Sequence, residues 1–579
     1  MSTEKMTLYP ESCRAVADEV RKALRENRFV ERIRQKDYTL WKPEPKDITD
    51  RLGWLESPRA MMGRLSEIEE VVAGIRADGY TFALLLGMGG SSLAPEVFRR
   101  VFGVADGFLD LAVLDSTDPG AVLDYAGRLD LKRTLFIVST KSGGTVETSS
   151  FLRYFYNLAT ENLGAEEAGR HFIAITDPGS ALADIAGTRR FRHTFLNDPE
   201  IGGRYSALSF FGLFPAALIG MDVKRLLERA VAEKEGEFSC GNTEERGGAF
   251  LGALLGELAK RGRDKLTLLF SPQIAAFGDW IEQLIAESTG KEGKGILPVV
   301  GEPLGPFDVY GSDRVFVSLR IGDDRTGEEG LRTLAAAGHP VVDLRIVDRY
   351  DLGGQCFFWE MATVAIGWEL AINPFDQPDV EAAKVVARRM IAEYREKGAM
   401  PDETPAFKVP GIAVYGDVTS GTPGAALDEF MGKAVPGAYA AIQAYLRPCR
   451  ETAAALARLR LRLRERFRIA VTVGYGPRFL HSTGQLHKGD AGRGLFIQLT
   501  ADDLRDAPIP DELGQTASAL SFGVLKAAQA FGDRQALLDA GRRVLRLHLH
   551  DDVVDGVRSL NLAFRALFER NAKFKDLTP

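Results

Sequence analysis

A loop rich in hydroxyls and glycine is the first feature of this sequence with the means to do chemistry. Thr140, Ser142 and Thr145 carry hydroxyl donors, Lys141 adds a positive charge, and two glycines let the backbone come close to a ligand. The loop follows an apolar run typical of a buried strand and precedes a helical pattern. Free amides and the helix dipole at such a helix start favour an anion. The pattern therefore favours a phosphate-binding loop over an ordinary helix cap with spare hydroxyls.

A second loop of this kind lies earlier in the chain, where Gly90 and Ser91 follow another apolar run. It lacks the third glycine of a dinucleotide-binding fingerprint and the Gly-Lys-Thr/Ser of a Walker loop. Alone, it is equally typical of a plain strand-to-helix turn. Two hydroxyl-rich loops in one parallel sheet would, however, converge on one phosphate at the carboxyl edge of that sheet.

Two motifs carry groups suited to proton transfer. Gly203 and its neighbouring glycine precede Arg204, a spacing that can aim the guanidinium at developing negative charge. Gln283 and Glu287 are one helical turn apart on one face, ahead of a Gly break, where a glutamate can act as a general base. The alternatives are a surface turn with a solvated arginine, and a surface ion pair between Glu287 and Lys291.

A third polar motif marks a helix start. Gln377 precedes a first turn that contains acidic residues, and Lys384 follows on the same helix. Without other information, Lys384 is one more solvated helix lysine.

The bulk properties limit the class of protein. The chain has 579 residues, too many for one core, so we expect three or four domains. Its net charge is −7 without a basic block, so nucleic acid is not an expected partner. The four cysteines are isolated from one another, which predicts no structural metal. No signal-peptide pattern or membrane span is present, so we expect a cytoplasmic protein without a membrane partner.

The elements that must position these loops follow an α/β pattern. Residues 1–75 have helical spacing, and short apolar runs alternate with helical patterns from about residue 80. We predict a doubly wound parallel sheet over 76–240, a second over 241–400, and a carboxyl-terminal α/β region over 401–579.

Taken in order, the motifs resemble the glucose-6-phosphate isomerase family, which has two sugar-isomerase (SIS) domains in tandem. The resemblance covers roughly residues 80–395. It rests on the two phosphate-loop segments, on Gly-Gly-Arg-Tyr-Ser ending at Ser206, on Glu-Ser-x-Gly-Lys starting at Glu287, and on Phe-Asp-Gln-x-x-Val-Glu-x-x-Lys ending at Lys384.

The resemblance implies interconversion of glucose 6-phosphate and fructose 6-phosphate, a step of glycolysis and gluconeogenesis, by a homodimer without metal or organic cofactor. Glu287 would be the base that moves a proton between C2 and C1 through a cis-enediol, and Arg204 would stabilise the enediolate with Gln283 nearby. Lys384 and Gln377 would help ring opening and substrate placement. The residues implied to bind the sugar phosphate are Gly90, Ser91, Thr140, Lys141, Ser142, Thr145 and Gly203.

Three departures from the family qualify this expectation. Asp308 stands where the family has a ring-opening histidine, and Asp379 replaces a glycine of the last motif. The region after residue 400 resembles the tail of transaldolase–isomerase fusion proteins, although the chain has no room for a transaldolase. Because His481 and His487 lie in a polar, glycine-rich segment there, we predict that His487 or His481 replaces the missing histidine; the alternative is that both satisfy local backbone groups.

Two other functions remain open. A dual phosphoglucose/phosphomannose isomerase would need a threonine or glutamine change in the sugar pocket, which the sequence does not identify. A phosphosugar-sensing regulator would keep the SIS fold without catalysis, but a sensor has no use for Glu287 as a carbon-acid base. His548 and His550 alternate along a predicted strand without a third ligand nearby in the sequence, so we interpret them as structural.

Overall fold

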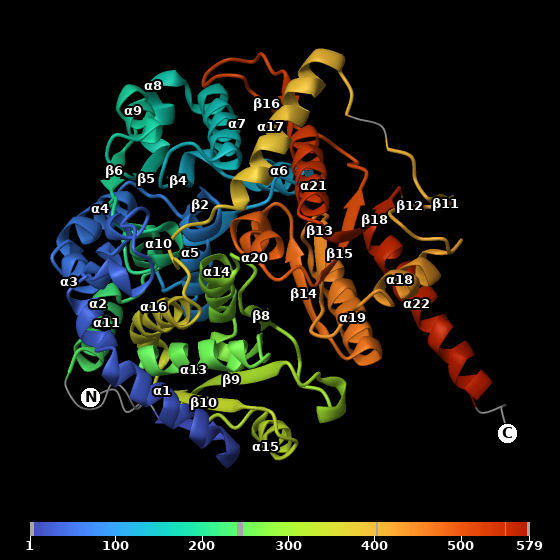
Figure 1. Cartoon of the computed structure of the whole chain (residues 1–579). Coiled ribbons are helices and arrows are strands. Elements are labelled where there is room, and N and C mark those ends of the chain that lie inside the picture. The colour runs from blue at the N-terminus through green and yellow to red at the C-terminus, as the bar shows by residue number, and fades with distance from the viewer. Residues whose placement is uncertain (1–4, 240–246, 401–402, 551, 576–579) are drawn as a thin grey trace.

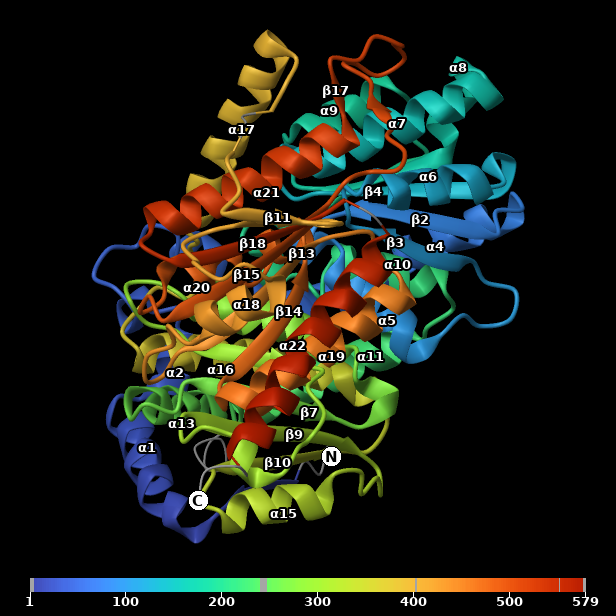
Figure 2. The same ribbon diagram turned by 90° about the vertical axis from the view of Figure 1, so that its right-hand side faces the viewer.

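Three parallel-strand sheets with flanking helices form the molecule (Figures 1 and 2). The computed structural model describes residues 5–239, 247–400, 403–550 and 552–575. The first sheet has the order β3-β2-β4-β5-β6, with every neighbouring pair parallel. Its strands are β2 (Phe82–Gly87), β3 (Asp110–Leu114), β4 (Thr134–Ser139), β5 (Phe172–Thr176) and β6 (His193–Leu196).

The second sheet has the order β1-β10-β9-β7-β8, in which only β1 is antiparallel. Its strands are β1 (Lys5–Tyr9), β7 (Lys265–Phe270), β8 (Leu297–Val300), β9 (Arg314–Ile321) and β10 (Val341–Ile346). The predicted helical segment over 1–75 thus begins with a strand: Leu8 pairs with Val342 at the edge of this sheet.

The third sheet lies in the carboxyl-terminal unit, which we define as residues 403–550 and 552–575. Its order is β11-β12-β18-β15-β13-β14, and the four strands from β18 to β14 are parallel. The strands are β11 (Phe407–Val409), β12 (Ile412–Tyr415), β13 (Tyr439–Tyr445), β14 (Ala470–Tyr475), β15 (Gly494–Ala501) and β18 (Arg543–Leu549). A small hairpin pairs β16 (Pro508–Ile509) with β17 (Leu520–Ser521).

All three sheets share one winding order for their parallel strands. In each, the first strand lies between the second and the third, and the fourth lies beyond the third, as in β3-β2-β4-β5, β8-β7-β9-β10 and β14-β13-β15-β18. The predicted α/β class is confirmed, and the carboxyl-terminal extension is a third doubly wound sheet. In such sheets the carboxyl ends of the strands form the ligand-binding edge.

Helices cover the sheets on both faces (Figure 1). The amino-terminal segment and the first unit contain α1 (Arg14–Glu26), α2 (Phe29–Arg34), α3 (Ser57–Met62), α4 (Leu65–Ala77), α5 (Leu93–Phe102), α6 (Pro119–Arg128), α7 (Val146–Leu163), α8 (Ala165–Ala168), α9 (Ala181–Thr188), α10 (Phe210–Leu218) and α11 (Val223–Glu237). The remaining helices are α13 (Gly248–Lys260), α14 (Phe277–Thr289), α15 (Glu328–Ala336), α16 (Leu352–Glu369), α17 (Val380–Lys397), α18 (Pro423–Met431), α19 (Arg450–Phe467), α20 (Gly484–Gly489), α21 (Phe522–Asp539) and α22 (Val553–Lys575).

Burial explains the central strands. Every residue of β4 is buried, as is β2 apart from Phe82, and both strands are dominated by Leu, Ile, Val and Phe. Continuous apolar runs are typical of parallel strands covered by helices on both faces. Thr140, directly after β4, and Gly89, two residues after the end of β2, are consequently held at the carboxyl edge of the first sheet.

The carboxyl-terminal unit packs against both other sheets. Phe522 and Leu525 join the apolar cluster under α7, and Phe151 stacks on Phe522 at 5.8 Å between ring centroids. Leu486 of α20 lies in a cluster with Ala286 of α14. Helix α17 runs beside α21 in both views (Figures 1 and 2). The unit therefore touches the elements that carry the candidate site.

Membrane spans and cysteines can also be compared with the sequence expectations. Among the described residues, no helix is long and apolar enough to span a membrane. Cys356 and Cys449 are unbridged thiols, and Cys240 lies outside the described residues.

Candidate active site

The loop between β4 and α7 borders a cavity of about 310 Å³. Ser142 and Thr145 line this cavity at the amino end of α7, and the hydroxyls of Thr140 and Thr145 lie 3.2 Å apart. Gly143 has a φ of 72°, and a Cβ there would lie 2.8 Å from the backbone nitrogen of Leu182, so only glycine fits. The result is an anion-compatible rim of hydroxyls and backbone amides.

Lys141 is engaged away from that rim. Its ammonium group forms an ion pair with Asp177 and donates to the carbonyl of Pro199 at 2.8 Å. Lys141 is not among the residues that line the cavity. In this conformation the ammonium group of Lys141 stabilises the loop through Asp177 and Pro199 and does not face the cavity.

The first glycine loop is locked against the arginine loop. A Cβ at Gly90 would lie only 2.1 Å from the carbonyl oxygen of Gly203, so the two backbones touch. Ser206 donates to the carbonyl of Gly90 at 3.3 Å, and the hydroxyl of Ser139 donates to the carbonyl of Ser91 at 2.8 Å. The predicted Gly90, Ser91 and Gly203 are thus fixed by contacts between neighbouring loops, and none of them lines the cavity.

Arg204 is a buried cation with 5% of its side chain exposed, and it is not among the residues that line the cavity. It donates to Ser288 Oγ at 2.7 Å and to Gln377 Oε1 at 3.0 Å, and a nitrogen of its guanidinium lies 3.3 Å from Glu287 Oε1. It also donates to the carbonyl of Pro374 at 2.8 Å. These partners compensate the cost of burying the charge.

Glu287 and Gln283 face each other on α14 as their spacing predicted. Gln283 Nε2 donates to Glu287 Oε2 at 3.0 Å, so Arg204 and Gln283 each hold one carboxylate oxygen. The same Gln283 nitrogen donates to the carbonyl of His481 at 2.7 Å. Because His481 lines the cavity, Glu287 is linked to the cavity wall through Gln283.

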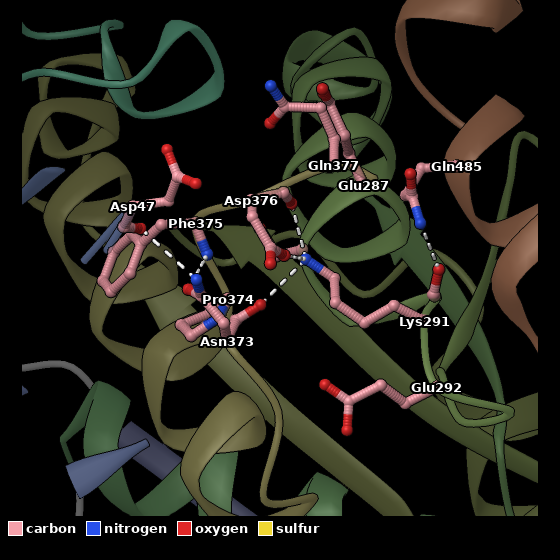
Figure 3. A network of polar contacts seen from close by, with 12 residues as sticks. Asp47, Glu287, Lys291, Glu292, Asn373, Pro374, Phe375, Asp376, Gln377 and Gln485 are labelled. Carbon is pink, nitrogen blue, oxygen red and sulfur yellow. Dashed lines mark hydrogen bonds and ion pairs between the residues drawn. The ribbon is translucent and has the colours of Figure 1, made fainter. Parts of the chain in front are cut away.

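Lys291 fixes the segment that carries Gln377 (Figure 3). Its ammonium is buried and donates to the carbonyl of Asn373 at 2.8 Å and to Asp376 Oδ1 at 2.7 Å. Burial, together with the positive charge of Arg204, lowers the pKa of Lys291 to about 8. Lys291 is therefore a buried support and not a surface partner of Glu287.

The carboxyl-terminal unit forms one wall of the cavity. His481, at the end of a short 3-10 helix (Arg478–His481), places Nε2 at 3.0 Å from Glu147 Oε1. Gln529 of α21 donates to the same oxygen at 2.7 Å. Burial raises the pKa of the Glu147 carboxyl, but the charge and hydrogen bond of His481, with Lys384 nearby, bring that pKa below its ordinary value. Glu147 is thus held as a carboxylate.

The cavity combines groups from the loop before α7, from α17 and from the carboxyl-terminal unit. Its polar lining consists of Ser142, Thr145, Glu147, Lys384, Arg388, His481, Lys488 and Gln529. Glu147 and Gln529 were missed as site residues because an acid in the first turn of a helix is ordinary, and Gln529 belongs to no motif.

The two candidate histidines have different environments. His487 is 2% exposed, its ring packs against Phe496 at 5.0 Å between centroids, and it does not line the cavity. Burial, with the charges of Lys488 and Arg542, lowers the pKa of the His487 ring well below its ordinary value. The structure therefore brings His481 to the cavity wall and leaves His487 in the apolar interior.

The two aspartates that depart from the family motifs, Asp308 and Asp379, have different environments. Asp308 is exposed in a 3-10 turn (Phe307–Val309) and does not line the cavity. Asp379 accepts a hydrogen bond from Gln485 at 2.6 Å, and its backbone N–H donates to Gln485 Oε1 at 2.9 Å. The aspartate in place of glycine is thus matched by a glutamine of α20.

Comparison with known proteins finds sequence similarity to phosphoglucose isomerases. Residues 26–296 match the family model described as phosphoglucose isomerase. A glucose-6-phosphate isomerase of Staphylococcus saprophyticus is 29% identical over 384 residues, which cover 58% of this chain and 86% of that protein.

Two solved structures share the fold. A hypothetical protein of Thermus thermophilus is 25% identical with a TM-score of 0.56, covering 67% of this chain and all of that one. A glucose-6-phosphate isomerase of Chlamydia trachomatis is 19% identical with a TM-score of 0.56, covering 68% of this chain and 89% of that one. With the motifs gathered around Arg204 and Glu287, these matches show that the chain is similar in sequence to the phosphoglucose isomerase family.

Proposed function

We propose that this protein interconverts glucose 6-phosphate and fructose 6-phosphate through a cis-enediol, with Glu287 as the base. The observation that carries the proposal is the Glu287 carboxylate, whose two oxygens are held by Arg204 at 3.3 Å and Gln283 at 3.0 Å. A carboxylate fixed in this way, and linked to the cavity wall through Gln283, suits proton transfer at a carbon next to a carbonyl.

The proton transfer itself needs only these groups. The Glu287 carboxylate takes the proton from C2 of the open-chain aldose, and the electron pair moves onto the carbonyl oxygen to give an enediolate. Arg204 stabilises this negative charge because its guanidinium is buried and fixed by several acceptors. Protonated Glu287 then returns the proton to C1, and the C2 hydroxyl becomes the ketone as its proton passes to O1.

The phosphate group would bind at the amino end of α7. Ser142 and Thr145 offer hydroxyls there, the backbone amides add donors, and Lys384 lines the same cavity from α17. Gln377, held by Arg204, would orient the sugar beside Glu287.

Ring opening would fall to His481 in place of the family histidine. It lines the cavity and is oriented by Glu147, an arrangement that suits an imidazole exchanging a proton with the ring oxygen. His487 is less suited to this step because it is buried away from the cavity.

The direct test is conversion of fructose 6-phosphate to glucose 6-phosphate by the purified protein. We expect turnover in the wild type and a loss of about 10²- to 10⁴-fold in Glu287→Gln. Glu292→Gln is the matched control, because Glu292 lies five residues further along, is exposed and pairs with Lys42. Phosphosugar binding without turnover in the wild type would contradict the proposal and indicate a sensor.

A further inference from the structure

A histidine pair lies at the carboxyl edge of the third sheet, outside the candidate active site. Strands β15 and β18 are parallel neighbours, and Thr500 of β15 is in register with His548 of β18. Asp502 follows β15 directly, and His550 follows β18. The sequence offered no third ligand near these histidines, but the fold supplies Asp502 from 46 residues away.

The three side chains already point at one another. His548 Nε2 lies 2.9 Å from Asp502 Oδ1, and His550 Nδ1 lies 2.9 Å from Asp502 Oδ2. One ligand atom from each residue can be chosen so that all lie within 4.8 Å of one another. Two imidazole nitrogens aimed at a single carboxylate require either two N–H protons or a cation between them.

A second contact orients the more buried histidine. The hydroxyl of Thr500 lies 2.9 Å from His548 Nδ1, which leaves Nε2 directed at the cluster. Metal-bound histidines characteristically use one ring nitrogen for the metal and the other for such a fixed partner. The backbone N–H of His550 donates to the carbonyl of Gly411 at 3.0 Å, which anchors the other side of the cluster.

We propose that Asp502, His548 and His550 bind a first-row divalent cation, with Zn²⁺ as the expected ion. Imidazole nitrogen suits zinc, copper, iron and nickel, whereas calcium and magnesium prefer sites made only of oxygen. Two histidines and a carboxylate provide three protein ligands, at distances of about 2.0–2.2 Å once an ion is bound.

The remaining coordination positions face an open cavity. Asp502, His548 and His550 line a space of about 430 Å³, together with Lys526, Arg546 and other residues. Water or a small anion from this cavity would complete the coordination, because three protein ligands leave at least one position open.

Helix α21 separates this cavity from the candidate active site. Leu525 and Gln529 of α21 line the active-site cavity, whereas Lys526 and Ala530 line the cation cavity. The proposed ion would therefore lie on the side of α21 opposite to Gln529, which donates to Glu147. It takes no part in the proposed proton transfer.

The test is titration of the chelator-treated, full-length protein with Co²⁺, whose visible absorption reports imidazole and carboxylate ligation, followed by competition with Zn²⁺. We expect one equivalent to bind in the wild type, and no such equivalent in His548→Ala or His550→Ala. Thr500→Val should weaken binding by about 10- to 100-fold, because it removes the hydroxyl that fixes His548.

His193→Ala is the matched control, because His193 lies in β6 and pairs with Glu67 at 3.6 Å. It should bind like the wild type. His550→Ala also guards against misfolding, because its side chain is 43% exposed and its loss leaves the core intact. Absence of stoichiometric binding in the wild type, or equal binding in a folded His550→Ala, would overturn the proposal.

Discussion

At the scale of single residues, the site depends on buried charges that are held by several partners. Arg204, Lys291 and Glu147 are each at most 5% exposed, and each has at least two polar contacts. A buried charge without partners costs several kcal/mol, so each network fixes one geometry. The motif spacing predicted Arg204 and Glu287 as site residues. Glu147 could be identified only from the fold, which brings His481 and Gln529 to it.

Lys291 gives stability a specific pH dependence. Because its pKa falls to about 8 in the folded chain, the folded state releases this proton more easily than the unfolded state. Between pH 8 and about 10.4, the ordinary lysine value, the unfolded state binds more protons, so this group makes the free energy of unfolding rise with pH. Below pH 8 the penalty is at its full size, at most about 3 kcal/mol.

The measurement is urea unfolding of the wild type and Lys291→Met at pH 7 and pH 9.5. The stability of the wild type relative to Lys291→Met should increase at the higher pH, since methionine does not titrate. Lys294→Met, at an exposed neighbour, should keep the wild-type pH dependence. A constant difference between wild type and Lys291→Met would show that the lysine pKa is not lowered.

The two histidines make a matched pair for testing ring opening. His481→Ala should reduce kcat for the ring-closed sugar by about 100-fold while sparing an open-chain analogue, because only the former needs ring opening. His487→Ala should instead lower the free energy of unfolding by about 3 kcal/mol, because it leaves a cavity among aromatic rings. Equal loss on both substrates in His481→Ala would contradict its proposed role.

At the scale of elements, close backbone contacts between loops set the geometry. The loop that carries Arg204 is held by the contact of Gly90 with Gly203, where a Cβ at Gly90 would meet a carbonyl oxygen at 2.1 Å. The family resemblance implied that Gly90 binds the sugar phosphate, whereas the structure shows that glycine is required there for the approach of a neighbouring loop. Sequence spacing could not distinguish these, because the partner lies 113 residues away.

Gly90→Ala should therefore disturb the site more than the fold. The added methyl group displaces the Arg204 loop, and a misplacement of about 1 Å can cost about 100-fold in kcat/KM. Gly127→Ala is the control: it lies in α6 with nothing within 4 Å of its Cβ, and alanine should add about 0.5–1 kcal/mol to the stability of the helix. Unchanged kcat/KM in Gly90→Ala would mean that the loops shift freely.

Most strands were predictable because their composition is strongly apolar, but one central strand was not. β13 (Tyr439–Tyr445) contains three alanines and a glutamine, so its residues do not form the apolar run that marks β4. It is nevertheless completely buried, because it pairs with β14 and β15 at both edges and packs against apolar clusters on both faces. β1 was missed because its few apolar residues continue the helical spacing of α1.

At the scale of the whole molecule, the unit built on the third sheet contributes to the candidate active site within the same chain. α20 contacts Gly290 directly: a Cβ at Gly290 would lie 2.2 Å from Leu486 Cα, and Gln485 donates to the carbonyl of Gly290 at 2.9 Å. His481 and Gln529 reach Glu147 from the same unit. We therefore expect the cavity wall to be complete in one chain, while the homodimer stays a prediction.

A buried ion network joins the first and third units. Lys526 donates to Asp118 Oδ2 at 2.9 Å and forms an ion pair with Asp503. Lys526→Met should lower the free energy of unfolding by about 3–5 kcal/mol, because it leaves Asp118 buried and unpaired. Adding Asp118→Asn to that variant should recover part of the loss, and Lys397→Met on exposed α17 should have no effect. Urea unfolding at pH 7 measures all three, and a neutral Lys526→Met would contradict a role in joining the units.

The most direct test of the central claim follows hydrogen at C1 and C2 during turnover in D₂O. If the Glu287 carboxylate carries the proton, the wild type should incorporate solvent deuterium at these carbons in part of its turnovers, as read by NMR, because exchange of the carboxylic acid with solvent competes with return of the proton. Glu287→Gln should lose both turnover and incorporation. Turnover or deuterium exchange at the wild-type rate in Glu287→Gln would contradict the assignment of Glu287 as the base.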